Sequence, residues 1–166
     1  FPAANVAELI AVLKANPGKY NFASPGSGNS SHLAAELFKS AAGVSMTHIP
    51  YKGDVPAITD LMAGQVQIMF MTSLVAATYL KDSRLRALAI AGPNRLASLP
   101  NVPTVAETGL TGFDASAWFG ISTQSAVPPA TVAKLNEALN KVLRLPEIKQ
   151  RIEGTDMTVG GGTPQQ

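Results

Sequence analysis

The sequence predicts an α/β fold with a mostly parallel sheet flanked by helices. Short apolar runs alternate along the chain with segments whose apolar residues recur at helical spacing, which is the pattern of strands joined by crossover helices. One run, residues 66–71, is almost continuously apolar, as expected for a strand covered on both faces. The chain has 166 residues, of which 46% are hydrophobic, so it can bury a substantial core.

The first two helices are predicted from their start and stop signals. Asn5 stands in an N-cap position with Glu8 three residues later, as in a capping box, and residues 16–18 (Asn-Pro-Gly) end the pattern. A second helix begins near His32 and ends at Gly43. Its buried side is expected to carry the apolar residues of one stripe, which are Leu33, Leu37, Phe38 and Ala41.

Later signals continue the alternation of strands and helices. Asp54 and Ser73 are expected to cap short helices, and Pro128 and Pro146 to open two more, because proline is favoured at the first helical position. The helix after Pro128 is expected to turn inward its apolar residues Val132, Leu135, Leu139 and Val142. The predicted strands are residues 20–23, 46–51, 66–71, 85–91, 113–123 (with Trp118 and Phe119 in its interior) and 157–159, and a short helix is expected around Val105.

Composition narrows the classes of function. The net charge is only +2, with no run of Lys and Arg, which argues against nucleic acid as a partner. The chain has no cysteine, and its two histidines lack a paired ligand spacing, so neither a metal nor a cofactor is expected. The most apolar window, residues 66–80, is shorter than the roughly 20 residues of a membrane span.

The turn between the first strand and the second helix carries the clearest sign of a ligand. Residues 24–31 read Ser-Pro-Gly-Ser-Gly-Asn-Ser-Ser. Such a turn leaves backbone N–H groups unpaired at the positive end of a helix, where they can hold an anion. The predicted carboxylate site comprises the N–H groups of residues 28–31 and the hydroxyls of Ser24, Ser27, Ser30 and Ser31. An ordinary glycine-rich turn into a helix explains the same composition.

Other loops are expected to reach the same site. Ligands of parallel sheets bind outside the carboxyl ends of the strands, where this chain has residues 51–54, 71–73 and 92–95. Tyr51, Lys52 and Thr72 are therefore candidate ligand-binding residues, with Lys52 offsetting the charge of an anion. A solvated lysine is the simpler interpretation of Lys52, and a helix cap explains Ser73.

Enzymatic interpretations have weaker support in the sequence. The glycine-rich turn matches neither a phosphate-binding Walker loop nor a dinucleotide-binding fingerprint, and there is no Gly-x-Ser-x-Gly elbow. A hydrolase that uses Ser27 or Ser30 with His32 remains an alternative, although no acidic partner is placed by the sequence. His32 is expected to brace the turn, and His48, inside an apolar strand, to be structural.

Several segments in order resemble the Bug-type extracytoplasmic solute receptors, the substrate-binding proteins of tripartite tricarboxylate transporters. The resemblance covers essentially the whole chain. The segments that carry it are residues 22–38 (FASPGSGNSSHLAAELF), 48–53 (HIPYKG), 60–67 (DLMAGQVQ), 85–89 (LRALA), 99–107 (LPNVPTVAE) and 118–120 (WFG).

The resemblance implies a periplasmic receptor of the type II binding-protein fold, with two α/β lobes that close on a small carboxylate. Residues 1–114 would form the complete second lobe, and residues 115–166 a crossover strand and an incomplete part of the first lobe. The other anion loop of the family would lie outside this chain. A lone lobe would expose its interlobe surface, through which it can dimerise or serve as an interaction module.

The resemblance also assigns the ligand-binding residues and the partners. Ser24, Ser27, Gly28, Asn29, Ser30 and Ser31 fall on the family's carboxylate loop, and His32 on its landmark position. Many relatives have a polar or acidic residue where this chain has Met71, which favours a carboxylate without an amino group. The implied partners are the solute and the membrane components of the transporter. Residues 163–166 look like the start of a further helix, so the chain is interpreted as a piece of a longer protein.

Overall fold

The computed structural model describes residues 1–81 and 84–165. The chain divides into two compact units, Phe1–Ala117 and Trp118–Gln166, which are described separately below. None of the described helices is both long enough and apolar enough to cross a membrane.

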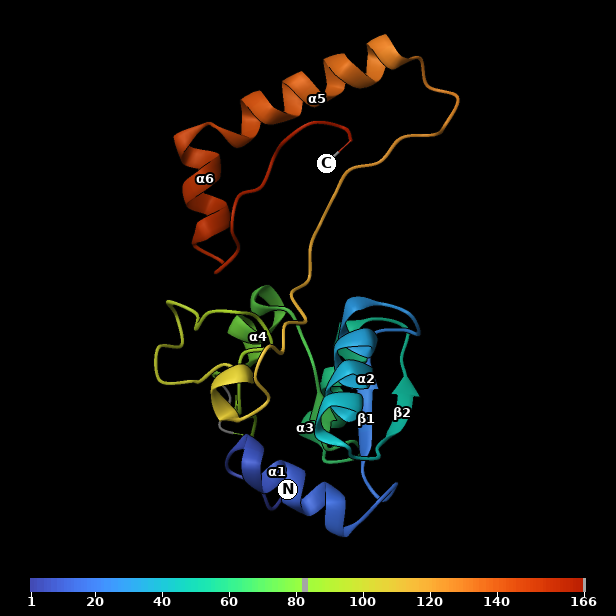
Figure 1. Cartoon of the computed structure of the whole chain (residues 1–166), viewed down its shortest axis with the longest axis vertical. Coiled ribbons are helices and arrows are strands. Elements are labelled where there is room, and N and C mark those ends of the chain that lie inside the picture. Colours follow the sequence, from blue (N-terminus) through green and yellow to red (C-terminus); the bar gives the residue numbers. More distant parts are fainter. Residues whose placement is uncertain (82–83, 166) are drawn as a thin grey trace. The chain divides into compact units, whose positions relative to one another are not determined.

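The N-terminal unit is built on a three-stranded parallel sheet with the order β2-β1-β3 (Figure 1). The central strand β1 (Asn21–Ser24) pairs with β2 (Thr47–Pro50) and with β3 (Ile68–Met69). The α/β class and the parallel sheet predicted from the sequence are therefore confirmed.

Helices connect and cover these strands. The helices of the N-terminal unit are α1 (Val6–Ala15), α2 (Ser30–Ala42), α3 (Asp54–Met62), α4 (Ser73–Tyr79) and the 3-10 helix η1 (Ala106–Thr108). The N-cap of α1 at Asn5 is confirmed, since Asn5 Oδ1 accepts from Glu8 N–H at 2.9 Å. The reciprocal bond of the predicted capping box is shifted by one residue, because Glu8 Oε2 accepts from Ala4 N–H at 2.7 Å. The predicted end of α2 is also confirmed, because Gly43 adopts a left-handed φ of 62°.

The sheet separates two apolar clusters, because successive residues of β1 point to opposite faces. Phe22 belongs to the larger cluster, together with Phe38 of α2 and Leu13 of α1. Ala23 belongs to the smaller cluster, with Ala57 of α3. Helices α2 and α3 therefore cover opposite faces of the sheet (Figure 1).

The predicted buried side of α2 is partly wrong. Leu33 and Leu37 are 59% and 43% exposed, and Ala41 is exposed as well. The helix instead buries Ser31, Ala34, Ala35, Phe38 and Ala42. Small side chains let α2 approach the sheet closely, and Phe38 fills the space beyond them, so the helix packs on its alanine face rather than on its leucines.

Two predicted caps are shifted by one residue. Gly53 is the N-cap of α3, and Asp54 is its first helical residue. Thr72 likewise precedes α4, whose first residue is Ser73. The acidic side chain of Asp54 still lies in the first turn of its helix, where the helix dipole stabilises a negative charge.

Several predicted strands are absent from the described residues. Residues 85–91 contain no strand and form only one parallel bridge, between Ile90 and Thr104. Leu88, Ala89 and Ala91 nevertheless pack against the larger cluster. An apolar run predicts burial but does not specify a pairing partner, and here the segment is partly buried without joining the sheet. β3 is likewise only two residues long.

The predicted strands 113–123 and 157–159 are also not formed among the described residues. In the first of these segments, Ala115 N–H donates to Ala91 O at 2.8 Å, but no ladder follows. Trp118 and Phe119 are 85% and 76% exposed. They are therefore neither core residues nor part of a strand.

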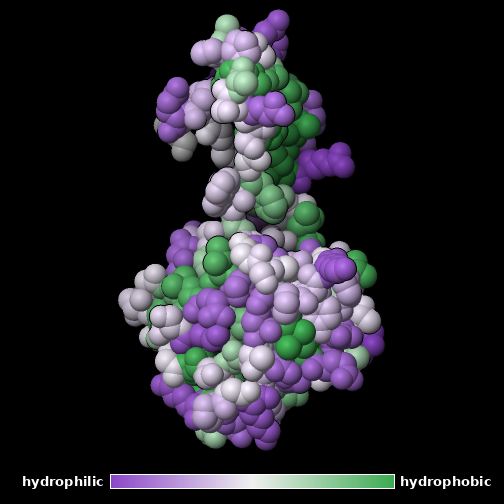
Figure 2. All heavy atoms as spheres, turned by 90° about the vertical axis from the view of Figure 1, so that its right-hand side faces the viewer, coloured by the Kyte–Doolittle hydropathy of each residue, from purple (hydrophilic) through white to green (hydrophobic). Residues whose placement is uncertain are grey.

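The C-terminal unit contains α5 (Pro129–Leu143) and α6 (Pro146–Glu153), each opened by its predicted proline. Neither helix has a buried residue. Leu135 and Val142, predicted to point inward, are 50% and 44% exposed, whereas Val132 and Leu139 are half-buried. Figure 2 shows apolar atoms gathered over part of this unit.

Side-chain amides join the end of the chain to α5. Asn140 Nδ2 donates to Gly162 O at 2.8 Å, and Gly162 N–H donates to Asn140 Oδ1 at 3.0 Å. The helix start predicted at residues 163–166 is a turn at residues 164 and 165. Gln166 lies outside the described residues.

Candidate functional site

The predicted site loops follow the carboxyl ends of the parallel strands. Residues 25–29 join β1 to α2, residues 51–53 join β2 to α3, and Thr72 precedes α4 after β3. The first two loops are held together, because Tyr51 N–H donates to Ser24 O at 2.9 Å and Gly53 N–H donates to Pro25 O at 3.1 Å. These loops therefore lie side by side, as the sequence predicts.

The remaining predicted loop, residues 92–95, does not follow a strand of the described sheet. Its basic residue, Arg95, forms an ion pair with Glu107 at 2.9 Å. Hydrogen bonds from Arg95 and Thr104 lower the pKa of the Glu107 carboxyl. This loop is fastened to η1, and its charge is compensated locally.

A glycine and an asparagine set the geometry of the turn into α2. Gly28 has a φ of 80°, a left-handed conformation that favours glycine. Asn29 is the N-cap, and its Oδ1 accepts from His32 N–H at 2.9 Å. Ser30 and Ser31 are then the first residues of the helix. The chain is thereby turned so that the first N–H groups of α2 point out of its N-terminal end.

Most of the N–H groups in this turn have no hydrogen-bond partner among the described residues. They belong to Ser27, Asn29, Ser30 and Ser31. The exception within the predicted set is Gly28, whose N–H donates to Nδ1 of His32 at 3.0 Å. His32 therefore braces the turn as predicted, and in doing so it occupies one of the predicted donors.

Ser24 lies beneath the turn and is fully buried. Its hydroxyl donates to Gly26 O at 2.8 Å and lies 2.6 Å from Nε2 of His48. When the hydroxyl proton of Ser24 goes to Gly26 O, Nε2 of His48 is the donor in its contact with Ser24 Oγ. The structural role predicted for His48 agrees with this arrangement.

His32, His48 and Phe22 form a cluster of three nearly parallel rings that the sequence did not predict. The ring centroids of His32 and His48 are 4.0 Å apart, and those of His48 and Phe22 are 4.8 Å apart. Phe22 and His48 are direct partners in the β1–β2 register, whereas His32 approaches from α2. Burial, and next the neighbouring His32, lower the pKa of His48.

A charged pair on α2 borders this cluster of rings. Glu36 Oε1 lies 3.8 Å from Nε2 of His32 and 2.8 Å from Nζ of Lys39. Lys39 also lies over the Phe22 ring, 5.5 Å from its centroid. The carboxylate of Glu36 is thus neutralised mainly by Lys39.

The predicted ligand-binding residues outside the glycine-rich turn, Tyr51, Lys52 and Thr72, differ in their contacts and exposure. The Tyr51 hydroxyl donates to Asp60 Oδ2 at 2.7 Å, and desolvation together with this bond raises the pKa of Tyr51 to about 12. Lys52 is exposed and Thr72 is half-buried. Tyr51 therefore fastens its loop to α3, whereas Lys52 is available to a ligand.

The contacts of the serine and histidine residues bear on the hydrolase alternative. No hydrogen bond joins Ser27 or Ser30 to His32 in the described part of the chain, and Nδ1 of His32 is already an acceptor for Gly28. Ser24 and His48 are close, but Ser24 is buried and its proton is directed to Gly26 O. Among residues 1–81 and 84–165, no three or more His, Cys, Asp or Glu side chains lie together so that they could hold a metal ion.

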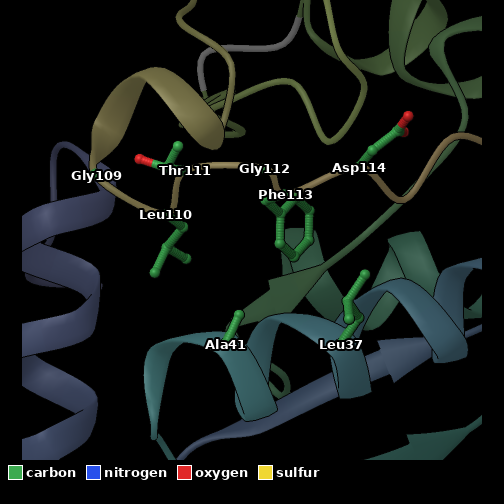
Figure 3. A pocket seen from close by; sticks show the side chains of 8 residues that line it. All are labelled: Leu37, Ala41, Gly109, Leu110, Thr111, Gly112, Phe113 and Asp114. Carbon is green, nitrogen blue, oxygen red and sulfur yellow. The ribbon is translucent and has the colours of Figure 1, made fainter.

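A shallow depression lies elsewhere on the N-terminal unit (Figure 3). It is lined by Leu37 and Ala41 of α2 and by residues 109–114. None of the predicted site residues lines it. Leu37 and Ala41 lie toward the C-terminal end of α2, so the depression is separate from the turn that carries the unpaired N–H groups.

The whole chain, residues 1–166, matches the model of the tripartite tricarboxylate transporter family receptors. The chain belongs to this family. It is 35% identical to a protein of the tcbD-tcbE intergenic region of Pseudomonas sp. strain P51, over 97% of this chain and 48% of that protein. It is also 35% identical to BugT of Bordetella pertussis, over 95% of this chain and 48% of BugT. The chain thus spans about half the length of these relatives.

Solved structures of related proteins have the same fold. The chain is similar to Rpa4515 of Rhodopseudomonas palustris with adipate, with a TM-score of 0.91, 30% identity, and coverage of 99% of this chain and 55% of that one. It is similar to MatC of the same organism with bound malate, with a TM-score of 0.86, 30% identity, and coverage of 95% of this chain and 54% of that one. It is also similar to the periplasmic binding protein BugD, with a TM-score of 0.82, 32% identity, and coverage of 93% of this chain and 52% of that one. The family is therefore one of solute-binding receptors.

Proposed function

We propose that this chain supplies one carboxylate-binding surface of a periplasmic receptor. The observation that carries the proposal is the set of unpaired N–H groups of Ser27, Asn29, Ser30 and Ser31 at the N-terminus of α2. Together with the helix dipole they form a partial positive charge without a charged side chain. Exposed Lys52, in the adjoining loop, adds a full positive charge.

The predicted site residues have different roles in this proposal. Ser27, Asn29, Ser30 and Ser31 contact the solute carboxylate, while Lys52 and Thr72 border it. Ser24, His32 and Tyr51 position the loops, because their polar atoms already bind Gly26, Gly28 and Asp60. Gly28 provides the left-handed turn that aims the neighbouring N–H groups.

The solute is proposed to be a small carboxylate without an amino group. The relatives of known structure with adipate and with malate support this class, and apolar Met71 follows the end of β3. Residues 1–114 would be one lobe of the receptor, and closure of the opposing lobe would complete the cage. The receptor would then deliver its solute to the membrane components of the transporter.

Nuclear magnetic resonance tests the proposed surface directly. Adipate and malate are titrated into the ¹⁵N-labelled chain, and the amide signals of residues 27–31 are followed. We expect these signals and that of Lys52 to move together and to saturate. Signals that move instead around residues 109–114, or none that move with either solute, would contradict the proposal.

A charge-matched pair of variants provides the control. Lys52→Gln removes the positive charge beside the turn, whereas Lys149→Gln removes one from α6 in the other unit. We expect weaker binding only in the first variant. Equal affinities in the two variants would show that Lys52 does not border the solute.

A further inference from the structure

Chemically, the His32–Gly28 hydrogen bond can exist in only one protonation state of the imidazole. Gly28 N–H donates to Nδ1 of His32 at 3.0 Å, so Nδ1 carries no proton and the neutral ring carries its proton on Nε2. A second proton would go to Nδ1. Two donors would then face each other, and this bond would be lost.

The surroundings of His32 permit this change. Its side chain is 22% exposed, so solvent can deliver the proton. The titratable and charged groups around it are His48 of β2, which stacks on the ring, and Glu36 and Lys39 on α2 itself. Glu36 is held by Lys39 at 2.8 Å and lies 3.8 Å from Nε2 of His32. The contacts with His48, Glu36 and Lys39 do not involve Nδ1 of His32, whose partner is the Gly28 N–H.

We propose that protonation of His32 releases the Gly28 N–H and thereby couples carboxylate binding to proton uptake. This inference rests on the proposed function, which places the solute at the same turn. With His32 neutral, the turn offers the N–H groups of Ser27, Asn29, Ser30 and Ser31. With His32 protonated, Gly28 joins them and the imidazolium adds a positive charge next to the anion.

The direction of the coupling follows from thermodynamic linkage. If the protonated form binds the anion more tightly, the anion must in turn favour the protonated form. Affinity is then expected to rise as pH falls through the range in which His32 gains its proton. One linked proton changes the dissociation constant by at most about tenfold per pH unit.

The first experiment needs no solute. The pH is varied over the ¹⁵N-labelled chain while the Gly28 amide signal and the His32 ring signal are recorded. We expect both signals to titrate with one common midpoint, because both report the same proton. A Gly28 amide that does not follow the His32 ring would overturn the proposal.

Two matched variants show which histidine controls the Gly28 amide signal. His32→Asn places an oxygen where Nδ1 stood, so it keeps an acceptor for Gly28 but cannot titrate; the Gly28 amide should then become insensitive to pH. His48→Gln keeps an Nε2 donor for Ser24, and the titration of Gly28 should persist. A Gly28 titration that survives in His32→Asn would overturn the proposal.

The second experiment measures the coupling with adipate as the probe. Calorimetric titration near neutral pH in two buffers of different ionisation enthalpy counts the protons taken up on binding. We expect net uptake in the parent chain and none in His32→Asn. Binding without proton uptake in the parent chain would overturn the coupling. If adipate does not bind at all while Gly28 and His32 titrate together, the proposed solute class is contradicted and the protonation-dependent bond stands.

Discussion

The rings of His32 and His48 lie parallel, with centroids 4.0 Å apart and planes inclined by 16°. Residues 16 positions apart in the sequence are thereby brought into contact on one face of the sheet. His32 reaches down from the first turn of α2, and His48 points up from β2. The contact joins the glycine-rich turn to the strand beside it.

Stability should depend on pH through His48. Burial and His32 lower its pKa from the ordinary value of 6.5, so below that value the unfolded chain binds more protons than the folded protein. The free energy of unfolding should therefore be fully retained above 6.5 and should fall as pH drops toward the depressed folded pKa. His48→Gln keeps a donor for Ser24 and should reduce this loss. Urea unfolding of the parent chain and of His48→Gln, at pH values on both sides of 6.5, measures this loss of unfolding free energy. Equal losses in the two proteins would show that His48 does not cause the pH dependence.

Solute binding should be lost in Gly28→Asp. The carboxylate would lie next to the proposed anion, and repulsion of about 1.4 kcal/mol or more would weaken binding at least about tenfold. Gly28→Asn is the matched control, because asparagine tolerates the same left-handed backbone and has no charge. Calorimetric titration with adipate compares the two variants. Similar affinities in Gly28→Asp and Gly28→Asn would argue against an anion at this turn.

Asn29 should contribute to stability and to binding by separable means. Asn29→Ala removes the acceptor for His32 N–H and should cost about 0.5–2 kcal/mol in the free energy of unfolding. Asn29→Asp keeps the acceptor and should retain stability, while its negative charge weakens carboxylate binding. Urea unfolding and adipate titration of both variants test the separation. A stable Asn29→Ala protein would show that the cap is dispensable.

The buried side of α2 can be tested by truncating two of its apolar residues. Phe38 is 1% exposed, and its ring lies 5.8 Å from that of Phe70 and 6.3 Å from that of Phe113. Phe38→Ala should therefore lower the free energy of unfolding by about 3–5 kcal/mol. Leu33 is 59% exposed, and Leu33→Ala should change that free energy by no more than about 0.5 kcal/mol. Chemical denaturation measures the free energy of unfolding of both variants. A larger loss in Leu33→Ala than in Phe38→Ala would contradict the buried side described here.

Features set by neighbouring residues were predictable from the sequence. The N-cap bond between Asn5 and Glu8 and the left-handed Gly43 depend on groups within one helical turn of each other. The bracing role of His32 also belongs here, since its partner Gly28 is four residues away. Residue type and spacing are sufficient for such contacts, because the backbone itself brings the groups together.

Features set by pairing between distant segments were not predictable. Nothing in residues 85–91 distinguishes an apolar run that joins a sheet from one that packs on the core outside it. The leucines of α2 are exposed because its alanines fit the sheet more closely, and this depends on the opposing surface. The stack of His32 on His48 required both the β1–β2 register and the path of α2. A single sequence specifies neither directly.

The parallel pairing of β1 also makes the turn at residues 24–31 depend on distant parts of the chain. Parallel neighbours cannot be joined by a tight turn, so β1 gains its partners only after α2 and α3 have crossed the sheet. A short peptide of residues 24–31 would lack the strand, the histidine stack and the neighbouring loop that hold the turn. Ligand binding at this turn would therefore report that the surrounding half of the chain has folded.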